Sequence, residues 1–382
     1  SRNIILLALA LVLAVAGALY WALPPSEVER TSSSNADEAN LLSALMEVSS
    51  DGFQGPSASW KLDLPKDHGH HTNSRTESWH VATHLRNEDG KELGFQFSFL
   101  RLGIISGDPP PPTSIWDVRE INQGHVAIFN TFVERAFGEE RFGRGTRGLG
   151  GYDPSAQELR LDNWFLRFDS DESGSYMTLY ATVLDKAVVD LVMRPEKPTL
   201  ALTPDDAGAP FVGYSMTRLA VEGTIDQGLG EETVTGSAWF DHVWGELPLP
   251  GMRPVASDRL QLQLGDGTDL SVIRTRRIDG AGAPVVSGFV VSPDGTASLL
   301  DEKSLQMTSS RTWRDPVTGA EYPVEWRILG PNLDITIVPL ADAQAFDTAV
   351  PVWSGMVQSS GRRANTVVSG VGTLQLTGYS AP

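Results

Sequence analysis

The sequence contains no cysteine. This absence excludes disulfide-stapled scaffolds, cysteine zinc sites, iron–sulfur clusters and thiol nucleophiles. Positive charge is also scarce, because 30 Lys and Arg stand against 48 Asp and Glu and the formal net charge is −18. We therefore expect no nucleic-acid partner, since such binders need a basic surface to displace phosphate counterions. Nothing in the composition indicates a cofactor, and we expect none.

Amphipathic helical periodicity is equally scarce. The best helical pattern covers residues 123–137, whereas short apolar or alternating runs bounded by Gly, Pro, Asn and Asp recur from about Gly52 onward. The clearest example is a hairpin over residues 260–273, in which Leu260 and Leu262 share one face. Many short strands at regular spacing predict an all-β chain built as sandwiches or barrels.

The length predicts about two domains, since the 382 residues exceed a single domain of about 150 residues. Gly228 and Gly230 interrupt the strand pattern behind a run of strand-like residues. We therefore place one β domain over residues 52–226 and a second over residues 232–382.

A long apolar run opens the chain. Residues 4–23 carry no charged side chain, and twenty such residues are about enough to cross the hydrocarbon core of a bilayer as a helix. Tyr20 and Trp21 fit an interfacial aromatic belt, and Pro24 cannot continue a helix. The run therefore predicts a helix embedded in the lipid bilayer through residues 4–23.

The flanking charges predict the orientation of this segment, because Arg2 precedes the run and acidic residues follow it. We expect residues 1–25 to form a single-pass anchor in a bacterial inner membrane and residues 26–51 a polar tether. The bulk of the chain would then lie in the periplasm. A secretory signal cleaved near residues 16–18 is the alternative.

Histidines are concentrated in one segment, where five of the seven lie between positions 68 and 84. If residues 79–85 form a strand, His80 and His84 share one face. A copper or zinc site is one interpretation. Polar loop contacts and buried, hydrogen-bonded histidines are the interpretation that we prefer, because no spacing here is specific to a metal. The weak metal candidates are His68, His70, His71, His80 and His84.

Arg75 and Glu77 lie two residues apart in the same segment and would face the same side of an extended chain. One interpretation is a buried ion pair beneath a barrel floor. The other makes Glu77 a proton donor, because burial raises the pKa of a carboxylic acid toward neutrality.

The run PKDHGHHTNSRTESWHVATHLRNEDGKELGFQFSFLR resembles the opening signature of the carotenoid 1,2-hydratase (hydroxyneurosporene synthase) family. Later pieces agree in the same order, namely GSAWFDHVWG, the hairpin over residues 260–274, RDPVTGAEYPVEWRI and LQLTGY. The resemblance implies two consecutive lipocalin-like β-barrel domains. It also implies an apolar, isoprenoid-like ligand and acid-catalysed addition of water to a double bond.

The resemblance further implies which residues act. A carboxylic acid protonates the alkene and aromatic rings stabilise the cation that forms. We expect Asp241 as the first choice for the acid, because its aromatic neighbours would desolvate it, and Glu77 as the second. The expected ligand-binding residues are Trp79, His80, Trp239, Trp244, His242 and Arg75. Ordinary core packing is the alternative role for the tryptophans.

Two departures from the family pattern weigh against retained catalysis. The family reads Thr-Glu-Trp-Trp-Tyr where this chain has Ser78 before Trp79 and His80 after it. The aromatic Gly-Trp-Asp-Trp-Phe run expected after Gly245 is also missing.

Three hypotheses follow: a hydratase, a non-catalytic accessory subunit that joins integral membrane proteins, and a histidine-based metal carrier. We weigh the first two about equally and place the third behind them.

Overall fold

The computed structural model describes residues 51–57, 59–107, 118–130, 134–145, 150–202, 211–246 and 255–379. Within these residues the chain is all-β, with two antiparallel sheets and one short 3-10 turn, η1 (Lys66–His68). The predicted all-β class is therefore confirmed. The expected anchor and tether lie outside the described residues. In the described part of the chain, no helix has the length and apolar character needed to cross a bilayer.

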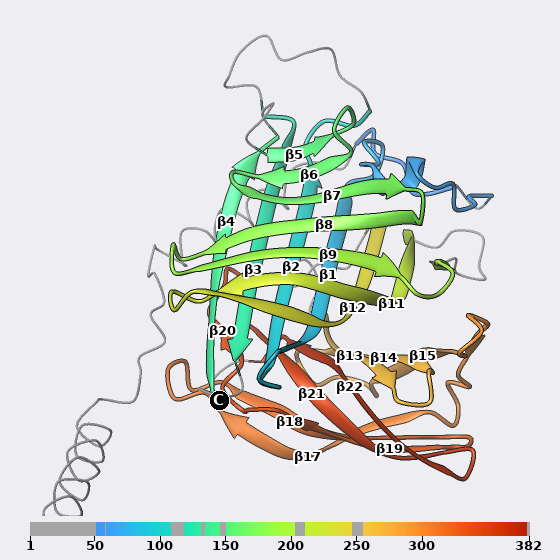
Figure 1. Cartoon of the computed structure of the whole chain (residues 1–382). Coiled ribbons are helices and arrows are strands. Elements are labelled where there is room, and N and C mark those ends of the chain that lie inside the picture. Colours follow the sequence, from blue (N-terminus) through green and yellow to red (C-terminus); the bar gives the residue numbers. More distant parts are fainter. Residues whose placement is uncertain are drawn as a thin grey trace, which may run out of the picture. The chain divides into compact units, whose positions relative to one another are not determined.

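The first sheet curls into a nearly closed barrel (Figure 1). Its strand order is β4-β3-β2-β1-β12-β11-β9-β8-β7-β6-β5, with β10 paired to β11. The strands are β1 (Thr76–Asn87), β2 (Glu92–Gly103), β3 (Glu120–Asn130), β4 (Arg135–Arg144), β5 (Gly150–Asp153), β6 (Glu158–Leu161), β7 (Trp164–Asp171), β8 (Gly174–Val183), β9 (Ala187–Pro195), β10 (Leu200–Leu202), β11 (Phe211–Asp226) and β12 (Glu231–Gly245).

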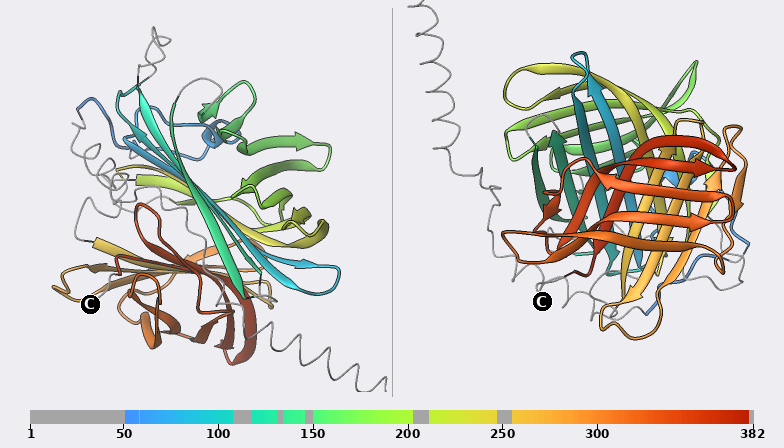
Figure 2. Two further views of the ribbon diagram at one scale, coloured as in Figure 1. Left: turned by 90° about the vertical axis from the view of Figure 1, so that its left-hand side faces the viewer. Right: turned by 90° about the horizontal axis from the view of Figure 1, so that it is seen from below.

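The second sheet forms a half-barrel (Figure 2). Its strand order is β16-β15-β14-β13-β22-β21-β19-β18-β17, with β20 paired to β21. The strands are β13 (Val255–Leu264), β14 (Asp269–Arg277), β15 (Val285–Val291), β16 (Ala297–Leu299), β17 (Gln306–Arg314), β18 (Glu321–Gly330), β19 (Leu333–Pro339), β20 (Ala345–Phe346), β21 (Val352–Arg363) and β22 (Thr366–Thr377). The two sheets fit two lipocalin-like domains, and the predicted 260–273 hairpin is the β13–β14 pair.

Alternation along β1 divides its side chains between two environments. Trp79 and Val81 point into the core of the first barrel, together with Phe97 of β2. The next residues along the strand, including His80 and Ala82, point the other way. Their register partners on β12 are Asp241 and Trp239. This opposite face packs on the second sheet, as the hydrogen bond from Ser237 Oγ to Gln263 Oε1 (2.5 Å) shows. We call this contact between the two sheets the seam.

One prediction about secondary structure is wrong. A helix was predicted over residues 123–137, but residues 123–130 lie in β3 and residues 135–137 lie in β4. The reason is that Val126 and Ile128 alternate into the barrel core, a period of two that the helical pattern obscured.

The change of sheet also falls later than predicted. Asp226 and Glu231 are register partners in the β11–β12 hairpin, so β12 belongs to the first sheet. Gly228 (φ 81°) and Gly230 (φ 111°) supply the left-handed conformations of that tight hairpin rather than a linker.

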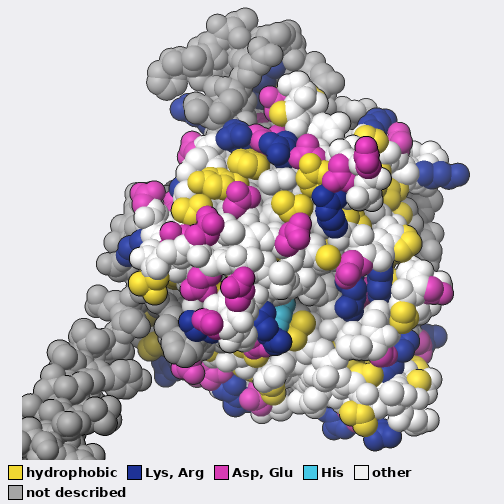
Figure 3. Space-filling view, viewed as in Figure 1, with side chains coloured by type: hydrophobic (Ala, Val, Ile, Leu, Met, Phe, Trp, Pro, Cys, Tyr) yellow, Lys and Arg dark blue, Asp and Glu magenta, His cyan; other side chains and the backbone are white. Residues whose placement is uncertain are grey.

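The surface carries both signs of charge. On the face shown in Figure 3, Asp and Glu side chains are interspersed with Lys and Arg over the described surface.

Candidate functional site

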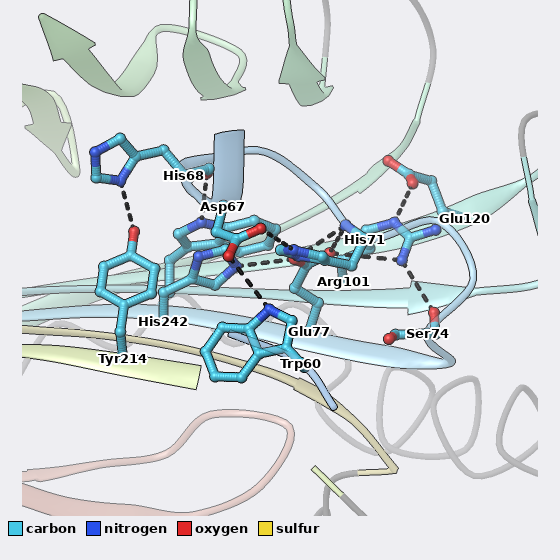
Figure 4. Close-up of polar contacts among 11 residues, drawn as sticks. Trp60, Asp67, His68, His71, Ser74, Glu77, Arg101, Glu120, Tyr214 and His242 are labelled. Carbon is cyan, nitrogen blue, oxygen red and sulfur yellow. Dashed lines mark hydrogen bonds and ion pairs between the residues drawn. The ribbon is translucent and has the colours of Figure 1, made fainter. Parts of the chain in front are cut away.

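A cluster of histidines and carboxylates lies where the segment before β1 meets the inner face of the first barrel (Figure 4). The turn η1 follows Pro65 and presents Asp67, whose Oδ2 accepts hydrogen bonds from Trp60 Nε1 (3.2 Å) and the Asp63 backbone N–H (2.9 Å). These bonds fix the local chain direction, and the following loop brings His71 over the start of β1. We call His71, Glu77 and His242 the floor cluster.

Glu77 lies at the centre of the floor cluster and is fully buried. Its carboxylate accepts hydrogen bonds from the His71 backbone N–H (2.9 Å), His71 Nδ1 (2.7 Å) and His242 Nε2 (2.8 Å). Arg101 Nη1 lies 3.7 Å from Glu77 Oε2. Burial by itself would raise the pKa of Glu77, but the hydrogen bonds from the two histidines hold that pKa well below its usual range. Glu77 is therefore an ionised acceptor and not a proton donor.

The two histidines differ in environment. Burial lowers the pKa of His242, so this ring is neutral near pH 7 and donates its Nε2–H to Glu77. Both ring nitrogens of His71 face carboxylates, with Nδ1 at 2.7 Å from Glu77 Oε1 and Nε2 at 3.4 Å from Asp67 Oδ1. Carboxylates only accept hydrogen bonds, so a doubly protonated His71 ring satisfies both contacts. The His71 side chain is also 22% exposed, whereas those of Glu77 and His242 are fully buried.

Tryptophan rings cover both histidines. The His71 ring stacks on Trp244 with centroids 3.6 Å apart, and the His242 ring stacks on Trp79 at 4.4 Å. Trp60 meets Trp244 edge to face at 5.1 Å. The floor cluster is thus a small set of polar groups enclosed by aromatic surface, in which electrostatic interactions are stronger than in water.

Within the described residues, the five histidines considered as weak metal candidates do not gather at one site. His68 Nδ1 lies 2.7 Å from the Tyr214 hydroxyl, and burial lowers the pKa of His68 to about 4. His70 packs beside Tyr152, while His80 and His84 lie on the seam face of β1.

Among the described residues, the floor cluster has a spacing that would suit a metal ion, because one ligand atom from each of its three side chains lies within 4.8 Å of the others. However, Glu77 already accepts three hydrogen bonds and has the Arg101 guanidinium 3.7 Å away. These contacts disfavour a metal cation and favour a proton network.

Asp241 occupies a different place, the seam between the sheets. Its carboxylate accepts hydrogen bonds from Trp239 Nε1 (3.0 Å), Gln261 Nε2 (2.7 Å), Ser215 Oγ and Arg259 Nη2. Gln261 and Arg259 belong to the second sheet, so Asp241 ties the two sheets together.

A small groove lies beside Asp241. Two of the carboxylate's donors, Trp239 and Gln261, line this groove together with His84 and Gln263. Neither Glu77 nor Asp241 belongs to its lining.

The arginine that contacts Glu77 is Arg101, its register partner on β2, and not the sequence neighbour Arg75. Arg75 is buried, with its guanidinium over the Phe53 ring (5.3 Å). Sequence reasoning missed Arg101, because strand register, and no local motif, brings it to Glu77. It also missed Trp60, for which the sequence carries no signal.

Comparison with known proteins agrees with this architecture. A family model described as AttH-like matches residues 56–379. A crystal structure of a Nitrosomonas europaea protein assigned to AttH is 25% identical and covers 86% of this chain and 100% of its own, with a TM-score of 0.73. Kievitone hydratase from Nectria haematococca is 14% identical over 86% of this chain and 98% of its own, with a TM-score of 0.62. CghA is 12% identical over 87% of this chain and 97% of its own, with a TM-score of 0.53.

The last two similarities show the fold alone. No curated protein matches the sequence. The resemblance to the hydratase family that the sequence motifs indicated is confirmed.

Proposed function

This chain belongs to the AttH-like family, and from that premise we propose that it binds an apolar, isoprenoid-like molecule and adds water to one of its double bonds. The observation that carries the proposal is the His71–Glu77 contact. A partly exposed imidazole is held at Nδ1 by a buried carboxylate (2.7 Å) and stacked on Trp244. This arrangement suits a proton donor in an aromatic, poorly hydrated site.

His71, rather than a carboxylic acid, is the donor in this proposal. Glu77 is ionised, and its charge stabilises the imidazolium and fixes the ring orientation, as a carboxylate does behind a catalytic histidine. Nε2 is the reacting atom, because its contact with Asp67 (3.4 Å) is looser than that of Nδ1 with Glu77. Such a positioned acid contributes about 10²–10⁴-fold to a rate.

The hydration balances in protons and electrons with water as the only co-reactant. The Nε2 proton adds to one alkene carbon, and the π-electron pair forms the new C–H bond. The adjacent carbon becomes a cation. Water then attacks that carbon through oxygen and returns one proton to Nε2, which regenerates the imidazolium and leaves an alcohol.

The tryptophans supply the second requirement, which is stabilisation of the cation. Cation–π contacts contribute roughly 0.5–2 kcal/mol each, and more in a dry site. Trp79 and Trp244 are buried in the first barrel beside the two histidines. Kievitone hydratase bears a hydratase's name on the same fold, which supports this reaction class without indicating the substrate.

The proposal is tested by identifying what the protein carries. The full chain, purified in mild detergent from its own membranes, should yield a bound apolar molecule on native mass spectrometry and solvent extraction. Trp244→Leu should reduce the yield of that molecule, because the aromatic wall beside His71 is lost. Trp353→Leu, at a tryptophan equally buried in the core of the second sheet, is the matched control. Equal yields from both variants, or no small molecule in the wild type, would count against the proposal.

A second candidate, an accessory subunit of a membrane complex, is favoured by one observation. Both carboxylates expected to act as acids are fully engaged, Glu77 by two histidines and Asp241 by four donors. In either case we propose that residues 4–23 anchor the chain in an inner membrane with its bulk in the periplasm. Co-purification of integral membrane subunits in fixed ratio, without a small ligand, would support this second candidate over the first.

A further inference from the structure

The second sheet carries a polar cluster that the proposed function does not use. Three segments far apart in the sequence meet there: the β13–β14 hairpin, strand β18 and the residues that follow β22. The cluster lies on the inner face of the half-barrel, since Leu260 and Val272 are two positions from Asp258 and Arg274, share their face, and belong to that core. Its members are Asp258, Arg274, Arg276, Tyr322, Trp326 and Tyr379.

One carboxylate is shared between two arginines. Asp258 is fully buried and accepts hydrogen bonds from Arg274 Nη1 (2.7 Å) and the Tyr379 hydroxyl (2.8 Å). Arg276 Nε lies 3.6 Å from the same carboxylate, while Arg276 Nη2 donates to the Thr377 carbonyl oxygen (2.8 Å). Two positive charges therefore face one negative charge, which leaves the cluster with a charge of about +1 inside a chain of net charge −18.

Both guanidinium groups are held in place by aromatic rings. Arg274 lies over Trp326 (5.4 Å to the ring centroid) and Arg276 over Tyr379 (4.0 Å). Stacked arginines keep the edges of their planar groups available for bidentate contacts with carboxylate, sulfonate or phosphate oxygens. The arginines are thus preorganised before any ligand arrives.

Donor capacity exceeds what the protein uses. A guanidinium has five N–H donors. Within the described residues Arg274 donates hydrogen bonds through Nη1 alone and Arg276 through Nη2 alone, so the other donors of the two groups are not used by the protein. The side chains of Arg274 and Arg276 are 23% and 14% exposed, whereas that of Asp258 is fully buried, so the arginines and not the carboxylate face the open side.

We propose that this cluster binds an organic anion, with the acidic group on Arg274 and Arg276 and an aromatic or apolar body on neighbouring rings. Trp313 and Tyr379 are partly buried and pack against the second core, which provides that apolar surface. The site lies in a different sheet from the floor cluster, so it does not depend on the hydration reaction.

The test uses two fluorescent probes of similar shape, the anion 1-anilinonaphthalene-8-sulfonate and the neutral N-phenyl-1-naphthylamine. Each is titrated against the full-length chain. Arg274→Gln and Arg276→Gln should each weaken binding of the sulfonate by roughly tenfold, the size expected for losing one charge-assisted hydrogen bond. Binding of the neutral probe should change less than about twofold.

Two variants complete the design. Arg327→Gln removes an exposed arginine of β18 that pairs with Asp334, and it should leave sulfonate binding unchanged. Arg274→Lys keeps the charge and should retain more sulfonate affinity than Arg274→Gln, which separates loss of charge from loss of packing. Equal sulfonate affinity in wild type, Arg274→Gln and Arg276→Gln would overturn the proposal, as would equal loss of both probes in properly folded variants.

Discussion

Glu77 and Asp241 point to opposite faces of the same pair of strands. On β1 and β12, Glu77 is the register partner of Trp244, whereas Asp241 is the register partner of His80, three positions further along β1. An odd separation places the two carboxylates on opposite sides of the sheet. The two acids expected from the sequence therefore cannot act together on one substrate. One belongs to the interior of the first barrel and the other to the seam.

Replacing Glu77 with Gln should destabilise the fold strongly. The substitution keeps the shape but removes the charge, and it leaves Arg101 and two histidines facing a neutral amide. Removing one partner of a buried ionic network costs about 3–5 kcal/mol. Urea unfolding followed by tryptophan fluorescence measures the effect. Glu325→Gln, which removes the partly exposed partner of Arg311, is the matched control and should cost about 1 kcal/mol or less. Equal unfolding midpoints for the two variants would contradict the account of the floor cluster.

Asp241→Asn separates a structural role from a catalytic one. We expect the variant to lose about 2 kcal/mol of stability, because a charge-assisted contact with Arg259 across the seam is weakened. Hydration activity, measured well below the unfolding temperature, should stay within a few-fold of wild type. A variant with wild-type stability and no activity would reverse the assignment and restore Asp241 as the acid.

Acid should weaken the fold through the buried histidines of the first barrel, His125 and His80 among them. Burial lowers the pKa of His125 to about 4. Burial lowers the pKa of His80 to about 4 as well, with repulsion from Arg259 adding to the shift and attraction to Asp241 opposing it. In the unfolded chain a histidine titrates near 6.5. The unfolded state therefore binds more protons between these values, and stability falls as the pH drops from about 6.5 to about 4.

The size of this effect should be roughly 1–3 kcal/mol per histidine. Urea midpoints measured from pH 7.5 to pH 4.5 give the slope. His125→Gln should flatten the curve, because one proton-binding group of the unfolded state is removed. A curve for His125→Gln that runs parallel to wild type over the whole range would show that His125 does not titrate as described.

Local patterning predicted much of the fold. The alternation of Leu260 and Leu262 located the β13–β14 hairpin, and the same period of two placed His80 and Ala82 on one face of β1. These features depend only on neighbours in sequence. The pattern over residues 123–137 led to a wrong prediction, because two strands that are close in sequence can mimic a helical period in a short window.

Local patterning could not predict the floor cluster. His242 reaches Glu77 because β1 and β12 pair across about 160 intervening positions, and no local motif encodes that register. The sequence singled out Glu77 and His242 separately, and it left two roles open, a buried ion pair or a protonated acid, for Glu77. Its protonation depends on donors that only the assembled barrel provides.

The central claim is that His71, held by Glu77, delivers the proton for hydration of an apolar alkene. The most direct measurement incubates the full chain with isoprenoid alkenes in ¹⁸O-labelled water and looks by mass spectrometry for labelled alcohol. We predict labelled product with wild type and with His84→Gln, which changes a histidine on the face of β1 opposite to that of Glu77. The rate of product formation should fall by about 10²-fold or more with His71→Gln. Labelled alcohol formed equally well by folded His71→Gln would contradict the role of His71 as proton donor.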